Sequence, residues 1–236
     1  MNLTNYAWIY SPDRYREPSG YCKGMRMKFT AILLMLFILV SCKHGANETK
    51  DVTLKLPYFN TADFTPDWEV AAHKIPQFAF VNQNGGIISN ETFKGKIYIA
   101  DFFFTSCPGI CPKLTKNMGK LQDTYADNDT VLLLSHTVMP WKDSIPLLKT
   151  YAKKNQVNVK KWHLVTGDKG AIYSIAREGY LADEDFTKTQ DESSFIHTEN
   201  FILVDKEGFI RGVYNGTLEV DVERLKRHVR VLLNEI

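Results

Sequence analysis

Two cysteines that lie close together in the sequence are the residues best suited to chemistry. Cys107 and Cys111 fall in the stretch FFFTSCPGICPKLTKNMGKL (102–121), separated by three residues, one more than in a Cys-X-X-Cys redox motif. Paired thiolates exchange disulfides, or they bind a soft metal ion, for which Cu(I) is the best match. The longer loop widens the space for an ion, but a Cys-X3-Cys disulfide is also compatible with this spacing. The spacing alone therefore leaves both uses open.

The residues inside and after the pair predict the shape of the loop. Pro108 and Gly109 suit the central positions of a type II turn, because proline fixes φ and glycine accepts a positive φ. Cys111 then caps a helix, and Pro112 takes the first helical position, where its missing N–H costs nothing. Free N–H groups and the helix dipole favour a thiolate there. We therefore expect both sulfurs to face one point and both thiols to have a lowered pKa.

The N-terminal part of the sequence predicts a lipoprotein signal peptide. An apolar run over residues 29–40 follows a basic flank and ends in Leu39-Val40-Ser41-Cys42, which resembles a lipoprotein box. The run is too short for a membrane-spanning helix, but it suits a signal peptide. The predicted segments are an upstream extension (1–24), the signal peptide (25–41), a lipidated tether that begins at Cys42 (42–65) and a folded domain (66–236).

Removal of the leader would leave a nearly neutral chain with one local thiol pair. The full sequence has 29 Lys and Arg against 27 Asp and Glu, and cleavage before Cys42 removes five basic and two acidic residues. The remaining chain has a net charge of −1, which gives it no electrostatic attraction to nucleic acid. Two cysteines this close together also exclude a disulfide scaffold. We expect the protein in the cell envelope, on the periplasmic side, attached to a membrane through a lipid on Cys42.

Hydrophobic patterns from about residue 76 onward predict an α/β domain. Predicted strands cover residues 78–81, 96–105, 130–138, 162–166, 200–205 and 209–214. Predicted helices cover residues 114–125, 144–155, 169–177 and 222–232. Alternating strands and helices indicate a mostly parallel sheet with helices on both faces. The final hairpin and helix match the second half of a thioredoxin fold, so we predict a thioredoxin-like α/β fold with N-terminal additions.

This fold adds a histidine to the candidate site. His197 precedes the strand at 200–205, and in a thioredoxin fold this loop faces the cysteine pair. Its imidazole is a candidate third metal ligand, and a hydrogen-bonded loop histidine is the alternative. His136 and Met139 follow the strand at 130–138, near the sheet edge where ligands bind in open parallel sheets. We interpret these two as residues that surround the ligands or contact a partner, rather than as ligands.

Three segments resemble the Sco/SenC family: CPGICP (107–112), WHLVTGD (162–168) and FIHTENFILVDKEGFIRGVYNG (195–216). That family comprises membrane-anchored copper proteins with a thioredoxin fold, linked to the assembly of cytochrome c oxidase. The resemblance implies a site of Cys107, Cys111 and His197 that holds one copper per chain, as Cu(I), Cu(II) or both. It also implies a metallochaperone that delivers copper to the CuA centre of oxidase subunit II, or that reduces the cysteines of that centre. A thiol reductant would then be a second partner.

One segment departs from the family pattern. After the second long strand the family often has Ser-Val-Asp-Pro, where this sequence has Ser-His-Thr-Val-Met-Pro (135–140). We expect partner contacts and metal tuning to differ here, so the recipient can be another copper-requiring protein.

Two enzymatic functions compete for the same cysteines. A thioredoxin-like thiol–disulfide oxidoreductase outside the cytoplasm would use the pair without His197, and it can coexist with copper binding, which requires the reduced pair. A thiol peroxidase fits less well, because Phe104 stands where peroxiredoxin-like proteins place a threonine. The sequence therefore favours a copper metallochaperone over a redox enzyme.

Overall fold

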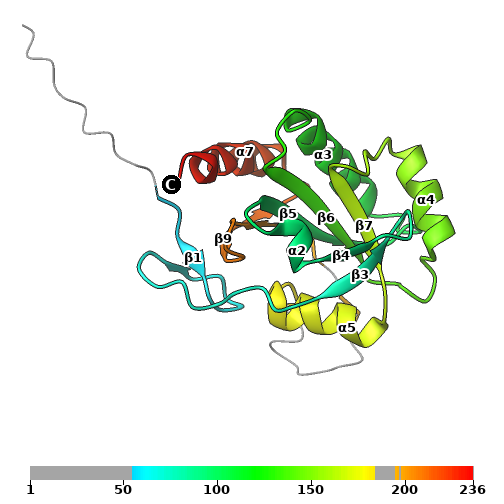
Figure 1. The fold of residues 1–236 in the computed structure, drawn as a ribbon, viewed down its shortest axis with the longest axis horizontal. Helices are drawn as coiled ribbons and strands as arrows, with labels where there is room; N and C mark the ends of the chain where they lie inside the picture. The colour runs from blue at the N-terminus through cyan, green and yellow to red at the C-terminus, as the bar shows by residue number, and fades with distance from the viewer. Residues whose placement is uncertain (1–54, 184–194, 197, 236) are drawn as a thin grey trace, which may run out of the picture. The chain divides into compact units, whose positions relative to one another are not determined.

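A seven-stranded sheet forms the centre of the structure, a computed structural model that describes residues 55–183, 195–196 and 198–235. The strands lie in the order β4-β3-β7-β6-β5-β8-β9 (Figure 1). Their bounds are β3 Ala79–Asn82, β4 Ile87–Ser89, β5 Ile97–Phe103, β6 Val131–Thr137, β7 Trp162–Thr166, β8 Asn200–Val204 and β9 Ile210–Asn215. The helices are α2 Asn90–Phe93, α3 Cys111–Thr124, α4 Ile145–Lys154, α5 Lys169–Ser174, the π-helix η1 Ile175–Gly179 and α7 Glu219–Asn234. Every predicted strand and helix is present, with its ends shifted by at most a few residues.

The sheet is mixed, whereas the sequence predicted a mostly parallel one. Strands β5, β6 and β7 are parallel to one another, but β3, β4, β8 and β9 pair antiparallel to their neighbours. The physical reason is that both outer strand pairs are hairpins. Their turns contain Gly85 (φ 82°) and Gly208 (φ 93°), which supply the positive φ that tight turns need. The α/β class is confirmed, with a parallel centre between two hairpins.

Each face of the sheet carries its own apolar cluster. All of β5 is buried, because its alternate residues enter the two clusters. The first cluster, which includes Ile99, Phe103 and Cys111, lies under α3, α4 and α7. The second cluster, which includes Phe102, lies under α2, α5 and η1. Figure 1 shows α3 and α7 on one side of the sheet and α5 on the other.

The folded unit begins earlier than the sequence predicted. The sequence predicts residues 55–65 as part of the tether, but they contain β1 (Tyr58–Phe59), which pairs with β2 (Pro66–Asp67) in a small antiparallel ribbon. Leu56 is only 3% exposed and belongs to the first cluster. The predicted extension, signal peptide, Cys42 and the rest of the tether lie outside the described residues. Among the helices that the structure describes, none is long and apolar enough to cross a membrane.

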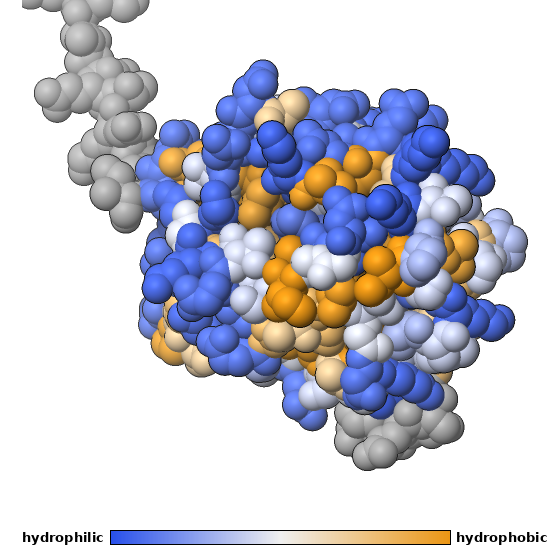
Figure 2. Space-filling view, turned by 45° about the vertical axis from the view of Figure 1, so that its right-hand side comes forward, coloured by the Kyte–Doolittle hydropathy of each residue, from blue (hydrophilic) through white to orange (hydrophobic). Residues whose placement is uncertain are grey.

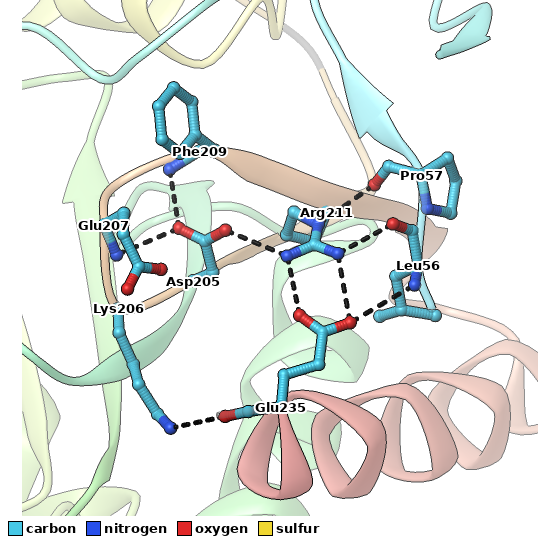
Figure 3. A network of polar contacts seen from close by, with 8 residues as sticks. All are labelled: Leu56, Pro57, Asp205, Lys206, Glu207, Phe209, Arg211 and Glu235. Atoms are coloured by element: carbon cyan, nitrogen blue, oxygen red, sulfur yellow. Dashed lines mark hydrogen bonds and ion pairs between the residues drawn. The ribbon is translucent and has the colours of Figure 1, made fainter. Parts of the chain in front are cut away.

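Arg211 of β9 explains why this early segment is part of the fold (Figure 3). Its Nε donates to the carbonyl of Pro57 (3.2 Å), and Nη2 donates to the carbonyl of Leu56 (2.7 Å). Nη1 contacts Asp205 Oδ2 (3.1 Å) and Glu235 Oε2 (2.9 Å), while Nη2 also reaches Glu235 Oε1 (3.1 Å). All five guanidinium N–H groups therefore have acceptors. The contacts join the N-terminal segment, the β8–β9 hairpin and the residue after α7.

Candidate metal centre

The cysteine loop connects the carboxyl end of β5 to the first turn of α3. Cys111 is the first residue of α3, one position later than the predicted cap, and Ile110 precedes it with φ −79° and ψ −29°. Gly109 does not have a positive φ, so the predicted type II turn is wrong. The chain coils toward the helix before Cys111, since the Ile110 carbonyl already accepts N–H groups from Lys113 (2.9 Å) and Leu114 (3.1 Å). The two thiols still lie close enough to form a hydrogen bond with one another.

Cys107 is the more acidic thiol of the pair. It is half-buried, and burial by itself raises the pKa of its thiol. The Cys111 thiol and the backbone N–H groups of Gly109, Ile110 and Cys111 outweigh that effect, and the pKa of Cys107 is lowered. N–H groups at a helix start stabilise the negative sulfur that they face. The loop therefore favours ionisation of the pair at Cys107.

Cys111 behaves in the opposite way, so the expectation of two acidic thiols is wrong for this residue. It is 4% exposed, and burial raises the pKa of its thiol to about 12. The hydrogen bond to Cys107 and the nearby negative charges of Cys107 and Asp101 contribute to this raised value. Both cysteines are free. Ionisation of the pair is therefore favoured at Cys107, whose sulfur accepts a hydrogen bond from the Cys111 thiol.

Asp101 is a site residue that the sequence reasoning missed. It is buried in β5, and burial raises the pKa of its carboxyl to about 7, although the hydrogen bond from Ser135 lowers it. The Ser135 hydroxyl donates to Asp101 and accepts the Trp162 Nε1–H at 2.8 Å. A single acidic residue within the apolar run KIYIADFFFT was the available signal. The structure thus adds a buried carboxyl whose charge acts on Cys111.

His136 lies on the opposite face of the sheet from the first cluster. The ring is fully buried, and it packs against Phe78, Phe80, Phe102 and Tyr180, with centroids between 5.3 and 6.0 Å away. Neither ring nitrogen has a hydrogen-bond partner among the described residues. Because side chains alternate along a strand, Ser135 faces the cysteine side and His136 faces away. The structure does not bring His136 to the cysteine pair.

The unfolding free energy is expected to fall in acid because of His136. Burial lowers the pKa of its imidazole from 6.5 to about 3, so the unfolded state binds more protons between these values. Lowering the pH from 7 to 5 should remove about 2 kcal/mol from the unfolding free energy through this group. Urea unfolding at both pH values measures the loss. His136→Leu should reduce it and raise the stability at pH 7, and equal losses in both proteins would contradict this account.

Of Met139 and His197, the structure describes only Met139. Met139 is half-buried against the second cluster, and its backbone N–H donates to Thr137 Oγ1 at 3.1 Å. His197 lies outside the described residues. The preceding residues do approach the loop, because the Phe195 ring contacts the Phe104 ring at 5.5 Å. Among the described residues no group of three or more His, Cys, Asp and Glu is placed to hold a metal ion. Of the three predicted ligands, the described residues therefore include Cys107 and Cys111.

The other described histidines, His73, His163 and His228, are each buried or held by a contact within the fold. His73 Nε2 contacts the carbonyl of Gly179 at 2.8 Å. His163 is buried in β7, where burial lowers the pKa of its ring. His228 is half-buried and contacts the Tyr214 hydroxyl through Nδ1 at 2.7 Å.

Comparisons with known proteins agree on one family. The family model described as SCO1/SenC matches residues 67–234. A SCO1 protein homolog of Bacillus subtilis (strain 168) is 34% identical over 146 residues, covering 61% of this chain and 75% of that protein. A protein of Stutzerimonas stutzeri that is named for copper binding is 31% identical over 149 residues, covering 62% of this chain and 72% of that protein.

Solved structures share the fold. A SCO1/SenC family lipoprotein from Bacillus anthracis str. Ames superimposes with a TM-score of 0.60 at 28% identity, covering 69% of this chain and 96% of that one. BsSco, described as having a disulfide switch and as a member of the Sco family of cytochrome c oxidase assembly proteins, gives a TM-score of 0.59. It is 29% identical, over 71% of this chain and 98% of that one. These similarities confirm the predicted thioredoxin-like α/β fold.

Proposed function

Because this chain belongs to the SCO1/SenC family, we propose that it is a copper-binding assembly factor of the cell envelope. It delivers copper to the CuA site of cytochrome c oxidase or to another copper-requiring protein, or it reduces the cysteines of that site. The observation that carries the proposal is the contact between two reduced thiols, Cys107 and Cys111, at the end of β5. The names of the relatives, which refer to copper binding and to oxidase assembly, support it.

The donor set fits Cu(I) as the cargo. Thiolates are the soft ligands that select this ion. Cys107 is already disposed to ionise, whereas Cys111 must lose its proton when the metal binds, because a metal ligates the deprotonated sulfur. Uptake therefore releases about one proton from Cys111 for each copper bound. The same raised pKa returns the proton to Cys111 after the copper has left.

His197 is the proposed third ligand, for a stoichiometry of one copper per chain. The contact of Phe195 with Phe104 supports this, because Phe104 also accepts the Cys107 N–H at 3.3 Å. Ile196 is buried. The segment on the N-terminal side of His197 is thus joined to the cysteine loop.

Membrane attachment is a further part of the proposal. The motif that ends in Cys42 supports a lipid anchor after removal of a signal peptide, with the domain on the periplasmic side. A relative described as a lipoprotein agrees with it. Because oxidised cysteines cannot bind copper, a thiol reductant must keep the pair reduced.

The proposal is tested by the copper affinity of a histidine variant. Competition with a chromogenic Cu(I) chelator should give one copper per purified chain in detergent. His197→Ala should weaken binding about tenfold or more, because even a residue that only supports a ligand costs 10–100-fold when it is lost. His73→Ala is the matched control and should leave affinity unchanged, since His73 contacts Gly179. An unaltered affinity in His197→Ala would remove this residue from the site, and a wild-type chain without copper would refute the function.

Thiol–disulfide exchange is the second candidate function. The lowered pKa of Cys107 beside the Cys111 thiol favours it, because exchange begins with attack by a thiolate. The metal-free chain would then reduce disulfides rapidly, and His197→Ala would not slow it. A slow reaction of this kind would leave copper binding as the main function.

A further inference from the structure

We propose that Asp143 positions the cysteine loop. Its buried carboxylate holds the segment before Cys107 against the end of β6, and so sets how closely Cys107 meets Cys111. The inference concerns the same thiol pair and in that sense rests on the proposed function, but its main consequence can be measured without copper.

The carboxylate of Asp143 joins two segments that are far apart in the sequence. Asp143 is only 1% exposed. Its Oδ2 accepts the backbone N–H of Thr105 at 3.1 Å, and its Oδ1 accepts the Thr105 hydroxyl at 2.6 Å. Oδ2 also accepts the hydroxyl of Thr137, the last residue of β6. Both carboxylate oxygens are therefore used to attach Thr105 to the edge of the sheet.

The turn that carries Asp143 is itself fixed to β6. The N–H groups of Lys142 (2.8 Å) and Asp143 (2.9 Å) both donate to the carbonyl of Met139. The Met139 N–H in turn donates to Thr137 Oγ1 at 3.1 Å. The carboxylate thus sits on a short, internally bonded turn. It is a fixed point against which the cysteine loop is held.

Asp143 acts on one cysteine of the pair and not on the other. Thr105 lies two residues before Cys107, so its two bonds to Asp143 fix the path of the chain into Cys107. Cys111 begins α3 and is a buried member of the first cluster, whereas Cys107 is only partly buried against that cluster. Loss of the carboxylate should therefore let Cys107 move relative to Cys111. A looser pair closes a disulfide less readily and binds a shared ion less tightly.

The hydrogen-bond donors that hold the Asp143 side chain are all neutral groups. Among the described residues no Lys, Arg or His forms an ion pair with Asp143. Hydrogen bonds to a carboxylate are stronger than those to a neutral amide. In Asp143→Asn, the amide N–H groups can face the donors of Thr105 and Thr137, so that two donors meet without an acceptor between them. Asn therefore keeps the shape of the side chain but loses the attachment, which makes it the informative substitution.

The test is the disulfide equilibrium of the metal-free chain with glutathione. In this reaction the Cys107–Cys111 dithiol and one glutathione disulfide give the protein disulfide and two glutathione thiols, so atoms and electrons balance. The fraction oxidised is read by alkylation and mass spectrometry of the tryptic peptide 97–113, which contains only these two cysteines. Asp143→Asn should shift the equilibrium about tenfold toward the dithiol, equivalent to about 30 mV. Thr105→Val, which removes only the hydroxyl donor, should shift it less in the same direction.

Asp205→Asn is the matched control. Asp205 is also buried and accepts backbone N–H groups from Glu207 (3.0 Å) and Phe209 (2.9 Å), but it lies at the other end of the sheet. Its variant should lower the unfolding midpoint and leave the glutathione equilibrium unchanged. The inference is overturned if Asp143→Asn lowers the unfolding midpoint but leaves the glutathione equilibrium unchanged. If Asp143→Asn does not fold, an unchanged glutathione equilibrium in Thr105→Val overturns it instead. Absence of copper in the wild-type chain would refute the proposed function, and the glutathione result would still decide the role of Asp143.

Discussion

Replacing Cys107 with serine is expected to lower the affinity for Cu(I) at least about 100-fold, because residues that merely support ligands already cost 10–100-fold. Serine has nearly the same shape, but its hydroxyl does not ionise at neutral pH and is a poor partner for a soft ion. Cys107 is also the thiol whose pKa the loop lowers. Its loss therefore removes the sulfur that is ready to bind.

Cys111→Ser should produce a loss of similar size for a different reason. The remaining Cys107 keeps its backbone N–H contacts from the start of α3, but a single thiolate cannot hold the ion from two sides. Cu(I) competition titrations on the full chain in detergent measure both losses. Cys42→Ser is the control variant. It should abolish lipidation and leave the copper affinity unchanged. Retention of wild-type affinity in either Cys107→Ser or Cys111→Ser would show that the metal binds elsewhere.

Replacing Arg211 with alanine is expected to lower the unfolding free energy by about 3–5 kcal/mol, the cost of leaving buried charges without their partner. The guanidinium is 3% exposed, and its removal leaves Asp205, which is 5% exposed, without its cation. The carbonyls of Leu56 and Pro57 lose their donors at the same time. We therefore expect both a weaker fold and release of the segment around Leu56.

Urea unfolding measures the stability of Arg211→Ala, and proteolysis near residue 55 reports release of the segment. Arg224→Ala is the control, because the Arg224 side chain is 44% exposed and its ion pair with Asp221 lies within one helix. Exposed pairs of this kind contribute about 0–1 kcal/mol. A loss of less than about 1 kcal/mol for Arg211→Ala would mean that the buried network does not tie the N-terminal segment to the domain.

The longer elements of the fold could be predicted because their periodicity is local. The buried run of β5 and the helical spacing of Leu114, Met118 and Leu121 are properties of neighbouring residues, and the structure has both. The ribbon of β1 and β2 and the three residues of β4 were not predicted. Strands of two or three residues carry no period, and partners elsewhere in the chain stabilise them. Arg211 lies more than 150 positions from the Leu56 carbonyl that it contacts.

For the candidate site, the residue types and their spacing were enough to identify the two thiols and to place them between a strand and a helix. Two cysteines four positions apart, between a buried strand and a helix, lie near one another even though the predicted turn is wrong. The opposite pKa shifts of the two thiols could not be predicted, because a pKa depends on burial and on nearby N–H groups, which follow from the folded arrangement. Cys107 accepts N–H groups at the start of the helix, while Cys111 is buried. The strand register also decided that His136 faces away from the pair, since one position along a strand exchanges the two faces of the sheet. The contact between Asp143 and Thr105 was equally beyond the sequence, because it joins residues 38 positions apart through folding alone.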